Sequence, residues 1–419
     1  MTMQITEKIQ QMARQSRVAA NAMLSATAGE RQKALSAIAE VIENNVNHIV
    51  AANAADLKNG EAKQLSPALL DRLALTPQRI AGMVKGVRQV AEQPDPIGTI
   101  TDLAVQPRGF KVGKMRTPIG VIGIVYESRP NVTVDAAAIC LKSGNACILR
   151  GGSEAFHSNR ILVDLMQTAL QTTALDTNII QFVDTTDREA VTAMLEAVGL
   201  IDVMIPRGGK SLVKLISDKA KVPVIKHLDG ICHVYIDEFA RDKMAVDVAF
   251  NAKTYRYGIC GAMETLLIHQ RKLDSVLPEL IEKYRQKGVE LLADKHIAER
   301  YDLPLASAED WASEYLAAKL SIKSVDSLKQ AIDHINTYGS HHTDAIITDN
   351  LTHQNEFLAL VDSASVMVNT ATCFADGFEY GLGAEIGIST DKLHVRGPVG
   401  VLGLTTEKMI ILGNGEIRS

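Results

Sequence analysis

Hydrophobic residues in the N-terminal part of the chain recur every three or four positions, most regularly over 34–50 and 80–90. Because these segments are also rich in Ala, Gln, Glu and Leu, the spacing predicts amphipathic helices. Ser66-Pro67 and Thr76-Pro77 are typical helix starts, each pairing a capping hydroxyl with a proline in the first turn. A helical region is therefore expected up to a linker at 93–98, which contains two prolines and a glycine.

Two short runs around Pro107-Arg108-Gly109 predict a β-hairpin over 102–117. Such a hairpin is expected to serve as an oligomerisation element, although a plain surface ribbon fits the pattern equally well. The tail after Leu393 alternates weakly, which allows it to pair with this hairpin.

From Gly120 onward, apolar runs alternate with helical patterns. Strands are expected at 121–126, 146–149, 179–183, 201–205 and 222–226, and helices at 132–142, 155–172, 189–198 and 210–217. Repeated β-α-β units predict a parallel sheet with helices on both faces. Such sheets bind ligands beyond the carboxyl ends of their strands.

A second α/β run extends over 234–368. Its clearest elements are a helix at 324–338, a strand at 344–348, a helix at 351–361 and a strand at 365–368. The predicted fold class is therefore α/β, with two parallel-sheet domains and a small β element for oligomerisation. Residues 1–226 form the expected cofactor-binding domain and 227–370 the catalytic domain. Residues 371–419 are expected to return to the first domain and end in an oligomerisation tail.

The composition is typical of a globular protein and gives no sign of a nucleic-acid-binding, membrane or secreted protein. The 419 residues are 46% hydrophobic and 22% charged, with a net charge of −5 spread along the chain, which does not suggest a partner such as nucleic acid or a membrane surface. The longest apolar run, 119–126, is too short to span a bilayer, and the polar N-terminus does not resemble a signal peptide. The five cysteines have no metal-ligand spacing, so reduced thiols and a cytoplasmic location are expected.

The candidate nucleophile is Cys260, which lies between a helical pattern that breaks near Tyr255 and an apolar strand at 264–268. Glycines on both sides of it allow a sharp turn and a close approach of a substrate carbonyl to the sulfur. A thiol presented on a turn suits acyl transfer, whereas the alternative is a small apolar filler. Arg256, four residues earlier, can favour a thiolate or hold an anionic substrate, or it can be a solvated residue at a helix end.

Two β-α turns carry cations beside helix starts. The first contains Arg150, Ser153 and Glu154, and the second contains Arg207, Gly208, Gly209, Lys210 and Ser211. A cation next to free N–H groups suits a phosphate or ribose of a dinucleotide, although an ordinary β-α turn explains each one equally well. Neither turn fits the common dinucleotide or P-loop fingerprints.

His341 and His342 are adjacent, but no third ligand stands at a plausible spacing. We therefore expect a polar or substrate-binding loop here and no metal site.

Several motifs together resemble the aldehyde dehydrogenase superfamily. Residues 118–125 match its strand motif P-x-G-V-x-x-x-I, and residues 144–154 match the segment G-N-A-x-I-L-K-P-S-E after its alanine-rich helix. His227-Leu-Asp-Gly230 stands in place of E-L-G-G-K, 33 residues before Cys260. Residues 314–320 resemble the element whose glutamate holds the nicotinamide ribose, and 336–339 resemble its A-N-x-x-Y-G-L turn. The resemblance covers nearly the whole chain. It implies the superfamily's fold, with Cys260 as nucleophile and Glu314 at the ribose.

The departures from this pattern are similar to one branch of the superfamily, the enzymes that reduce glutamyl 5-phosphate. Residues 126–132 replace the loop P-W-N-x-P, and His227 replaces the general-base glutamate. Residues 341–346 and 395–401 are also similar to segments of that branch. An oxidising aldehyde dehydrogenase needs a base to activate the water that hydrolyses its thioester, whereas an acyl-phosphate reductase must avoid this water. The branch implies NADPH-dependent reduction of glutamyl 5-phosphate to glutamate 5-semialdehyde, the second step of proline biosynthesis.

The resemblance also implies roles and partners. Asn131 and the backbone N–H of Cys260 are candidate oxyanion donors. Arg150 and Lys210 are expected at the adenosine phosphate, which favours NADPH over NADH. A homo-oligomer is expected, and a complex with glutamate 5-kinase is chemically sensible because the acyl phosphate is unstable. Two alternatives stay open: a general NAD(P)-dependent aldehyde dehydrogenase, and a non-catalytic dinucleotide-binding protein of the same fold.

Overall fold

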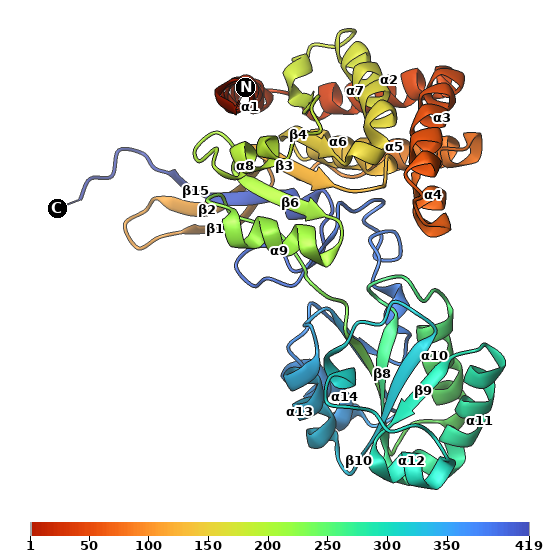
Figure 1. The fold of residues 1–419 in the computed structure, drawn as a ribbon. Helices are drawn as coiled ribbons and strands as arrows, with labels where there is room; N and C mark the ends of the chain where they lie inside the picture. Colours follow the sequence, from red (N-terminus) through yellow and green to blue (C-terminus); the bar gives the residue numbers. More distant parts are fainter. Residues whose placement is uncertain (1, 419) are drawn as a thin grey trace. The chain divides into compact units, whose positions relative to one another are not determined.

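The computed structural model describes residues 2–418 and divides into two compact units, whose elements are labelled in Figure 1. Unit 1 contains the chain up to Lys226, Gly381–Gly387 and the residues from Val399 onward. Unit 2 contains His227–Tyr380 and Ile388–Pro398. The chain was expected to return to the first domain at residue 371, but it first returns at Gly381. It then enters unit 2 again, where β13 (Ile388–Ser389) pairs with β14 (Gly397–Pro398), and returns to unit 1 at Val399.

Five helices open unit 1, where the sequence predicted a helical region. They are α1 (Thr2–Met23), α2 (Ala28–Asn44), α3 (Val46–Ala62), α4 (Pro67–Leu73) and α5 (Pro77–Glu92). The hydroxyls of Ser66 and Thr76 accept backbone N–H groups at the starts of α4 and α5, which confirms both predicted caps. The pattern over 34–50 is split between α2 and α3. Asn45 leaves the helical backbone conformation, and its side chain donates to the carbonyl oxygen of Val41 at 2.7 Å.

The sheet of unit 1 is parallel and has the strand order β5-β4-β3-β6. Its strands are β3 (Val121–Tyr126), β4 (Ala146–Gly151), β5 (Ile180–Phe182) and β6 (Val203–Arg207). Its helices are α6 (Asn131–Lys142), α7 (Phe156–Leu170), α8 (Glu189–Leu195) and α9 (Lys210–Lys219). Val121, Val125 and Ile148 pack against α1, α8 and α9 in one apolar core. The predicted β-α-β alternation is confirmed.

The predicted strand at 222–226 is wrong. Val224 forms one isolated bridge to Met204, with hydrogen bonds from the N–H of Met204 to the oxygen of Pro223 and from the N–H of Ile225 to the oxygen of Met204. Pro223 has no N–H to donate, so the apolar run does not extend into a ladder.

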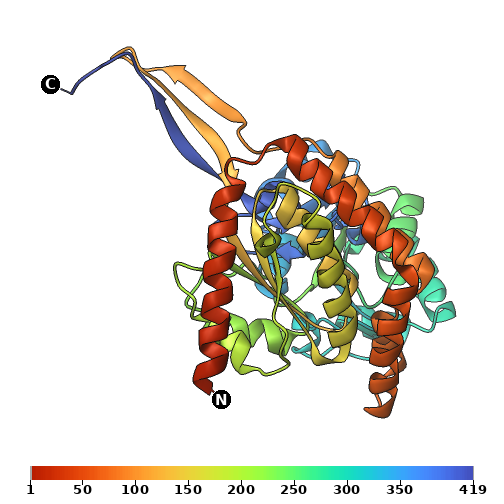
Figure 2. The ribbon, with the colours of Figure 1, turned by 90° about the horizontal axis from the view of Figure 1, so that it is seen from above.

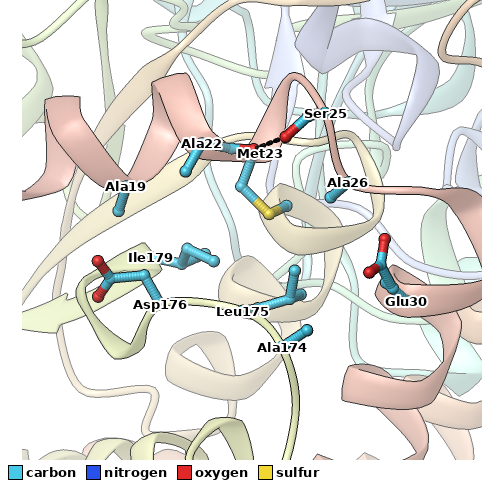
Figure 3. A pocket seen from close by; sticks show the side chains of 10 residues that line it. All are labelled: Ala19, Ala22, Met23, Ser25, Ala26, Glu30, Ala174, Leu175, Asp176 and Ile179. Carbon is cyan, nitrogen blue, oxygen red and sulfur yellow. Dashed lines mark hydrogen bonds between the residues drawn. The ribbon is translucent and has the colours of Figure 1, made fainter.

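A hollow of about 180 Å³ lies between the end of α1 and the segment that leads to β5 (Figure 3). Ser25 Oγ donates to the carbonyl oxygen of Ala22 at 2.9 Å. The Glu30 carboxylate accepts the N–H of Thr27 at 2.7 Å, and the Asp176 carboxylate accepts the N–H of Asn178 at 2.8 Å. These polar groups therefore serve local turns and helix starts.

An antiparallel ribbon of three strands extends from the rest of unit 1 (Figure 2). It consists of β1 (Ile100–Val105), β2 (Lys111–Pro118) and β15 (Thr405–Leu412). The predicted hairpin and its pairing with the C-terminal tail are confirmed, since β15 pairs with β2 along its whole length. The exposed large apolar side chains of the ribbon are Ile100, Leu103, Val105, Met409, Ile411 and Leu412.

The sheet of unit 2 is also parallel, in the order β12-β11-β7-β8-β10-β9. Its strands are β7 (Cys232–Ile236), β8 (Met263–His269), β9 (Glu290–Ala293), β10 (Lys319–Val325), β11 (Thr343–Ile347) and β12 (Ser365–Val368). Its helices are α10 (Asp242–Thr254), α11 (Leu273–Gln286), α12 (Lys295–Tyr301), α13 (Leu328–Tyr338) and α14 (Leu351–Leu360). Val234 and Leu266 pack with α10 and α11, whereas their neighbours Tyr235 and Leu267 pack with α13 and α14.

The helix predicted at 324–338 begins later than expected. Ser324 and Val325 belong to β10, which pairs with β8, and the hydroxyl of Ser327 then caps α13. Within residues 2–418, every helix is too short or too polar to cross a membrane.

Candidate active site

The candidate nucleophile lies at the amino-terminal edge of the unit 2 sheet. Gly230 precedes β7, Cys260 precedes β8, Glu314 precedes β10 and His342 directly precedes β11. Because the strands of a parallel sheet all begin at one edge, these distant segments meet there. The expectation that ligands bind at the carboxyl ends of the strands therefore does not describe Cys260.

Cys260 is half-buried on the turn between α10 and β8. Its carbonyl oxygen accepts a hydrogen bond from Cys232 Sγ at 3.1 Å. Cys232 is fully buried, and burial raises the pKa of its thiol well above the ordinary value. This thiol therefore keeps its proton and fixes the backbone of the turn as a donor.

The backbone of Gly230 packs directly against Cys260. A Cβ atom at position 230 would lie 2.1 Å from the carbonyl oxygen of Cys260, so no larger residue fits without moving the turn. The N–H of Gly230 donates to Glu314 Oε1 at 2.9 Å. Gly230 thus connects the predicted ribose-binding glutamate with the predicted nucleophile.

Two imidazoles lie beside the sulfur of Cys260. The donor atoms of His227, His342 and Cys260 all lie within 4.8 Å of one another, and the two rings meet edge to face with centroids 5.4 Å apart. His227 Nδ1 is 3.0 Å from the carbonyl oxygen of Ile388. A carbonyl only accepts, so in the neutral ring the proton is on Nδ1 and Nε2 carries a lone pair. His227 can therefore accept a proton beside the thiol.

A buried ion pair joins the two ends of the Cys260 turn. Lys253 Nζ, in the last turn of α10, lies 2.5 Å from Glu264 Oε2 in β8, and both side chains are inaccessible to solvent. Glu264 Oε1 also accepts the N–H of Leu316 at 3.1 Å, two residues beyond Glu314. Burial raises the pKa of Glu264 to about 7, against the opposing charge of Lys253. The pair links the Cys260 turn to the Glu314 segment.

In unit 1, Arg150 lies at the carboxyl end of β4 and is largely buried. Its Nη2 donates to the carbonyl oxygen of Thr186 at 2.9 Å, while its buried Nε has no hydrogen-bond partner within residues 2–418. Burial lowers the pKa of Arg150, and the positive charge of Arg188 lowers it further. A guanidinium with an unused N–H and a second arginine nearby suits a phosphate group.

The turn after β4 is connected to the loop after β3. Ser153 begins a short 3-10 turn, and Glu154 Oε1 accepts from the backbone N–H and the hydroxyl of Ser128 at 2.5 and 2.8 Å. Glu154 therefore holds these two loops together at the carboxyl edge of the sheet.

The loop after β6 leads into the start of α9. Gly209 is the N-cap residue, and Lys210 and Ser211 form the first turn. The carboxylate of Glu127 packs against Gly208 and accepts the N–H of Gly209 at 2.9 Å. Because this helix N-terminus already binds a carboxylate oxygen, its N–H groups suit an anion.

Arg207 ends β6, and its Nη2 lies 3.8 Å from Glu385 Oε1. The strand order reverses between β3 and β6, so these loops lie at the switch point of the sheet, where such folds bind ligands.

The contacts of the remaining predicted residues, Asn131, Arg256 and His341, do not by themselves assign them a role. In unit 1, Asn131 Nδ2 donates to Asp135 Oδ2 at 3.0 Å in the first turn of α6. In unit 2, Arg256 is exposed on the turn before Cys260, and His341 Nδ1 lies 2.6 Å from the carbonyl oxygen of Asp362. Of the adjacent histidines, His342 is the one beside the sulfur.

Sequence reasoning missed several residues of this site. The sequence marks His227 only as the replacement of a glutamate and Cys232 only as one of five thiols. It assigns no role to Lys253 or Glu264. One signal was available: a glutamate inside an apolar, buried strand needs a charged or hydrogen-bonding partner nearby.

Comparisons with known proteins show the family and the fold of this chain. A family model described as the aldehyde dehydrogenase family matches residues 2–313. A γ-glutamyl phosphate reductase from Thermotoga maritima is 40% identical, with 98% of this chain and 100% of that chain covered and a TM-score of 0.96. The γ-glutamyl phosphate reductase from Saccharomyces cerevisiae is 30% identical, with 98% of each chain covered and a TM-score of 0.55.

An acetylating aldehyde dehydrogenase from Geobacillus thermoglucosidasius is 16% identical, with 100% of this chain and 99% of that chain covered and a TM-score of 0.69, and it shares the fold. The α/β architecture predicted from the sequence, with two parallel sheets and extra antiparallel strands, is thus confirmed. Since the family model spans well over half of the sequence, the chain belongs to the aldehyde dehydrogenase family.

Proposed function

We propose that this chain reduces glutamyl 5-phosphate to glutamate 5-semialdehyde and phosphate with NADPH, the second step of proline biosynthesis. The observation that carries the proposal is the 40% identity, over nearly the whole chain, with a γ-glutamyl phosphate reductase. The proximity of the Cys260 thiol to two imidazoles supports the proposal, because this reaction needs a nucleophile and a proton acceptor.

Cys260 is the proposed nucleophile. Its thiol proton passes to a neighbouring imidazole, for which Nε2 of His227 is the candidate, and the thiolate attacks the γ-carbonyl carbon. The bond from this carbon to the phosphate oxygen breaks, phosphate leaves, and a thioester remains on Cys260. After reduction, the hemithioacetal collapses: its C–S bond breaks, the aldehyde leaves and the thiolate is restored.

Further groups must stabilise the oxyanion that forms on the carbonyl oxygen and bind the charged groups of the substrate. The backbone N–H of Cys260 and the side chain of Asn131 are the proposed oxyanion donors. Arg256, His341 and His342 are the proposed contacts of the substrate.

The family uses a nicotinamide dinucleotide, and we propose NADPH. Arg150, with Arg188 beside it, and Lys210 would hold the adenosine phosphate, with the turns of Ser153–Glu154 and Arg207–Ser211 around the dinucleotide. Glu314 would orient the nicotinamide ribose. Bound in this way, NADPH would supply the hydride that reduces the thioester.

We also propose a homo-oligomer that assembles through the ribbon β1-β2-β15. The ribbon exposes Val105 and Ile411, each 66% accessible, and apolar patches on strands favour pairing with another chain. A complex with glutamate 5-kinase and a cytoplasmic location are consistent with this chemistry.

The reverse reaction tests the proposal. NADPH formation from glutamate semialdehyde and NADP⁺ should depend strictly on added phosphate, because phosphate opens the thioester. Turnover without phosphate would instead mean that water opens it, as in a general aldehyde dehydrogenase. His227 stands where the oxidising enzymes carry their general-base glutamate, so turnover without phosphate is not the expected result.

Gly230→Ala tests the geometry of the site. The added Cβ should displace the Cys260 turn and lower kcat/KM by about 10²-fold, the loss expected when a reacting group moves by about 1 Å. Steady-state kinetics measure this loss. Gly82→Ala in α5 is the matched control, because a Cβ there meets nothing within 4 Å. Equal kinetics of the two variants would contradict the close packing of Gly230 against Cys260.

A further inference from the structure

His227, Cys260 and His342 have the donor types of a zinc site. Their donor atoms lie within 4.8 Å of one another, and they come from the segments before β7, β8 and β11. Zinc is bound in proteins mainly by cysteine thiolate and histidine nitrogen. The three residues are far apart in the sequence and show no metal-ligand spacing, because only the tertiary structure brings their donor atoms together.

The distances are compatible with a bound ion after small movements. In tetrahedral geometry zinc holds sulfur at about 2.3 Å and nitrogen at about 2.0–2.1 Å, so its donor atoms lie roughly 3.3–3.6 Å apart. The donor atoms must therefore approach one another by up to about 1.5 Å. Cys260 and His227 are only half-buried, so rotation of their side chains can make this movement while the backbone of the turn stays in place.

The surroundings orient the two rings as ligands. Ligating histidines usually donate their other ring N–H to a carbonyl or carboxylate. His227 meets this condition through Nδ1 and the carbonyl oxygen of Ile388 at 3.0 Å. The ring of His342 is held by Thr343 Oγ1, 2.9 Å from its Nδ1, and by Cys232 Sγ at 3.7 Å.

Cys232 does not complete a closed site. Its S–H donates a hydrogen bond to the carbonyl oxygen of Cys260 at 3.1 Å, so this thiol serves the backbone of the turn. Three protein ligands leave the fourth position of a tetrahedral ion open to water or to a substrate oxygen.

We propose that His227, Cys260 and His342 form a zinc site, and that zinc bound there reversibly blocks the nucleophile. Binding replaces the proton of the Cys260 thiol with Zn²⁺ and releases that proton. Binding depends on the geometry alone, whereas the inhibition rests on the proposed function.

The test is titration of the chelator-treated full chain with Zn²⁺ by calorimetry, and with Co²⁺ by absorbance. One ion per chain should bind, and Co²⁺ should give a thiolate-to-metal charge-transfer band that Cys260→Ala abolishes. His227→Ala and His342→Ala should each weaken binding by more than about 10-fold, since even outer-shell partners contribute this much. Zinc should inhibit NADPH formation, and a chelator should restore it.

Cys373→Ala and His341→Ala are the matched controls and should retain zinc binding, since Cys373 is another half-buried thiol of unit 2 and His341 is the neighbouring histidine. Unchanged fluorescence of Trp311, the one tryptophan of the chain, shows that unit 2 of each variant is folded. Zinc binding that survives Cys260→Ala would overturn the site. An active reductase that binds no zinc would refute this inference alone, whereas a zinc-binding protein without reductase activity would refute the proposed function and keep the site.

Discussion

Replacing Cys260 with serine should lower the turnover number by at least about 10³-fold, because the hydroxyl is a far weaker nucleophile than a thiolate. The two side chains are nearly the same size, so the turn between α10 and β8 should keep its shape. NADPH binding should stay unchanged, since the proposed phosphate-binding residues belong to unit 1. The measurement is NADPH formation in the phosphate-dependent reverse reaction, with NADPH fluorescence as the binding assay.

Cys373→Ser is the matched control for this variant and should keep the wild-type rate. Iodoacetamide gives a second readout, since it should label Cys260 quickly and substrate should protect this thiol. If Cys260→Ser turned over at a rate near that of the wild type, the nucleophile assignment would be wrong. A Cys260 that neither reacts nor is protected would favour a non-catalytic dinucleotide-binding protein.

Replacing Lys253 with methionine should destabilise unit 2 by about 3–5 kcal/mol, the usual cost of leaving one partner of a buried ion pair uncompensated. Lys253 and Glu264 are both inaccessible to solvent, so water cannot replace the lost ammonium group. The displaced Glu264 should also disturb the turn of Cys260. Urea unfolding followed by the fluorescence of Trp311 measures the loss within unit 2.

The stability loss caused by Lys253→Met should increase with pH. Burial raises the pKa of Glu264 from 4.5 to about 7, and Lys253 opposes the rise, so its removal should move the pKa higher. A carboxyl group with a raised pKa takes up a proton on folding, and stability then falls as the pH rises from 4.5 through the folded pKa. Lys253→Met should therefore lose more stability at pH 8 than at pH 5.

The double variant Lys253→Met/Glu264→Leu is the control, because apolar replacements of both partners are often neutral. It should recover most of the lost stability and have no added pH dependence between pH 5 and 8. A single variant whose stability loss is the same at both pH values would argue against a charged Glu264 as the cause.

Most of the fold could be predicted because its signals are local. Strand β3 has the predicted bounds, and proline next to a capping hydroxyl predicted the starts of α4 and α5. Two of the errors lie where a single side chain overrides a periodic pattern. Asn45 splits one predicted helix, and Pro223 prevents a strand.

The sequence by itself determined the two parallel α/β sheets, the family and the turn that presents Cys260, because periodicity, turn residues and motifs are properties of short segments. Only the tertiary structure decided what surrounds the sulfur. His227 and His342 are more than a hundred residues apart, and Cys232 gave no signal of its own. They meet Cys260 because β7, β8 and β11 are neighbours in the sheet and start at the same edge. Strand order depends on long-range packing, and a local pattern carries no information about it.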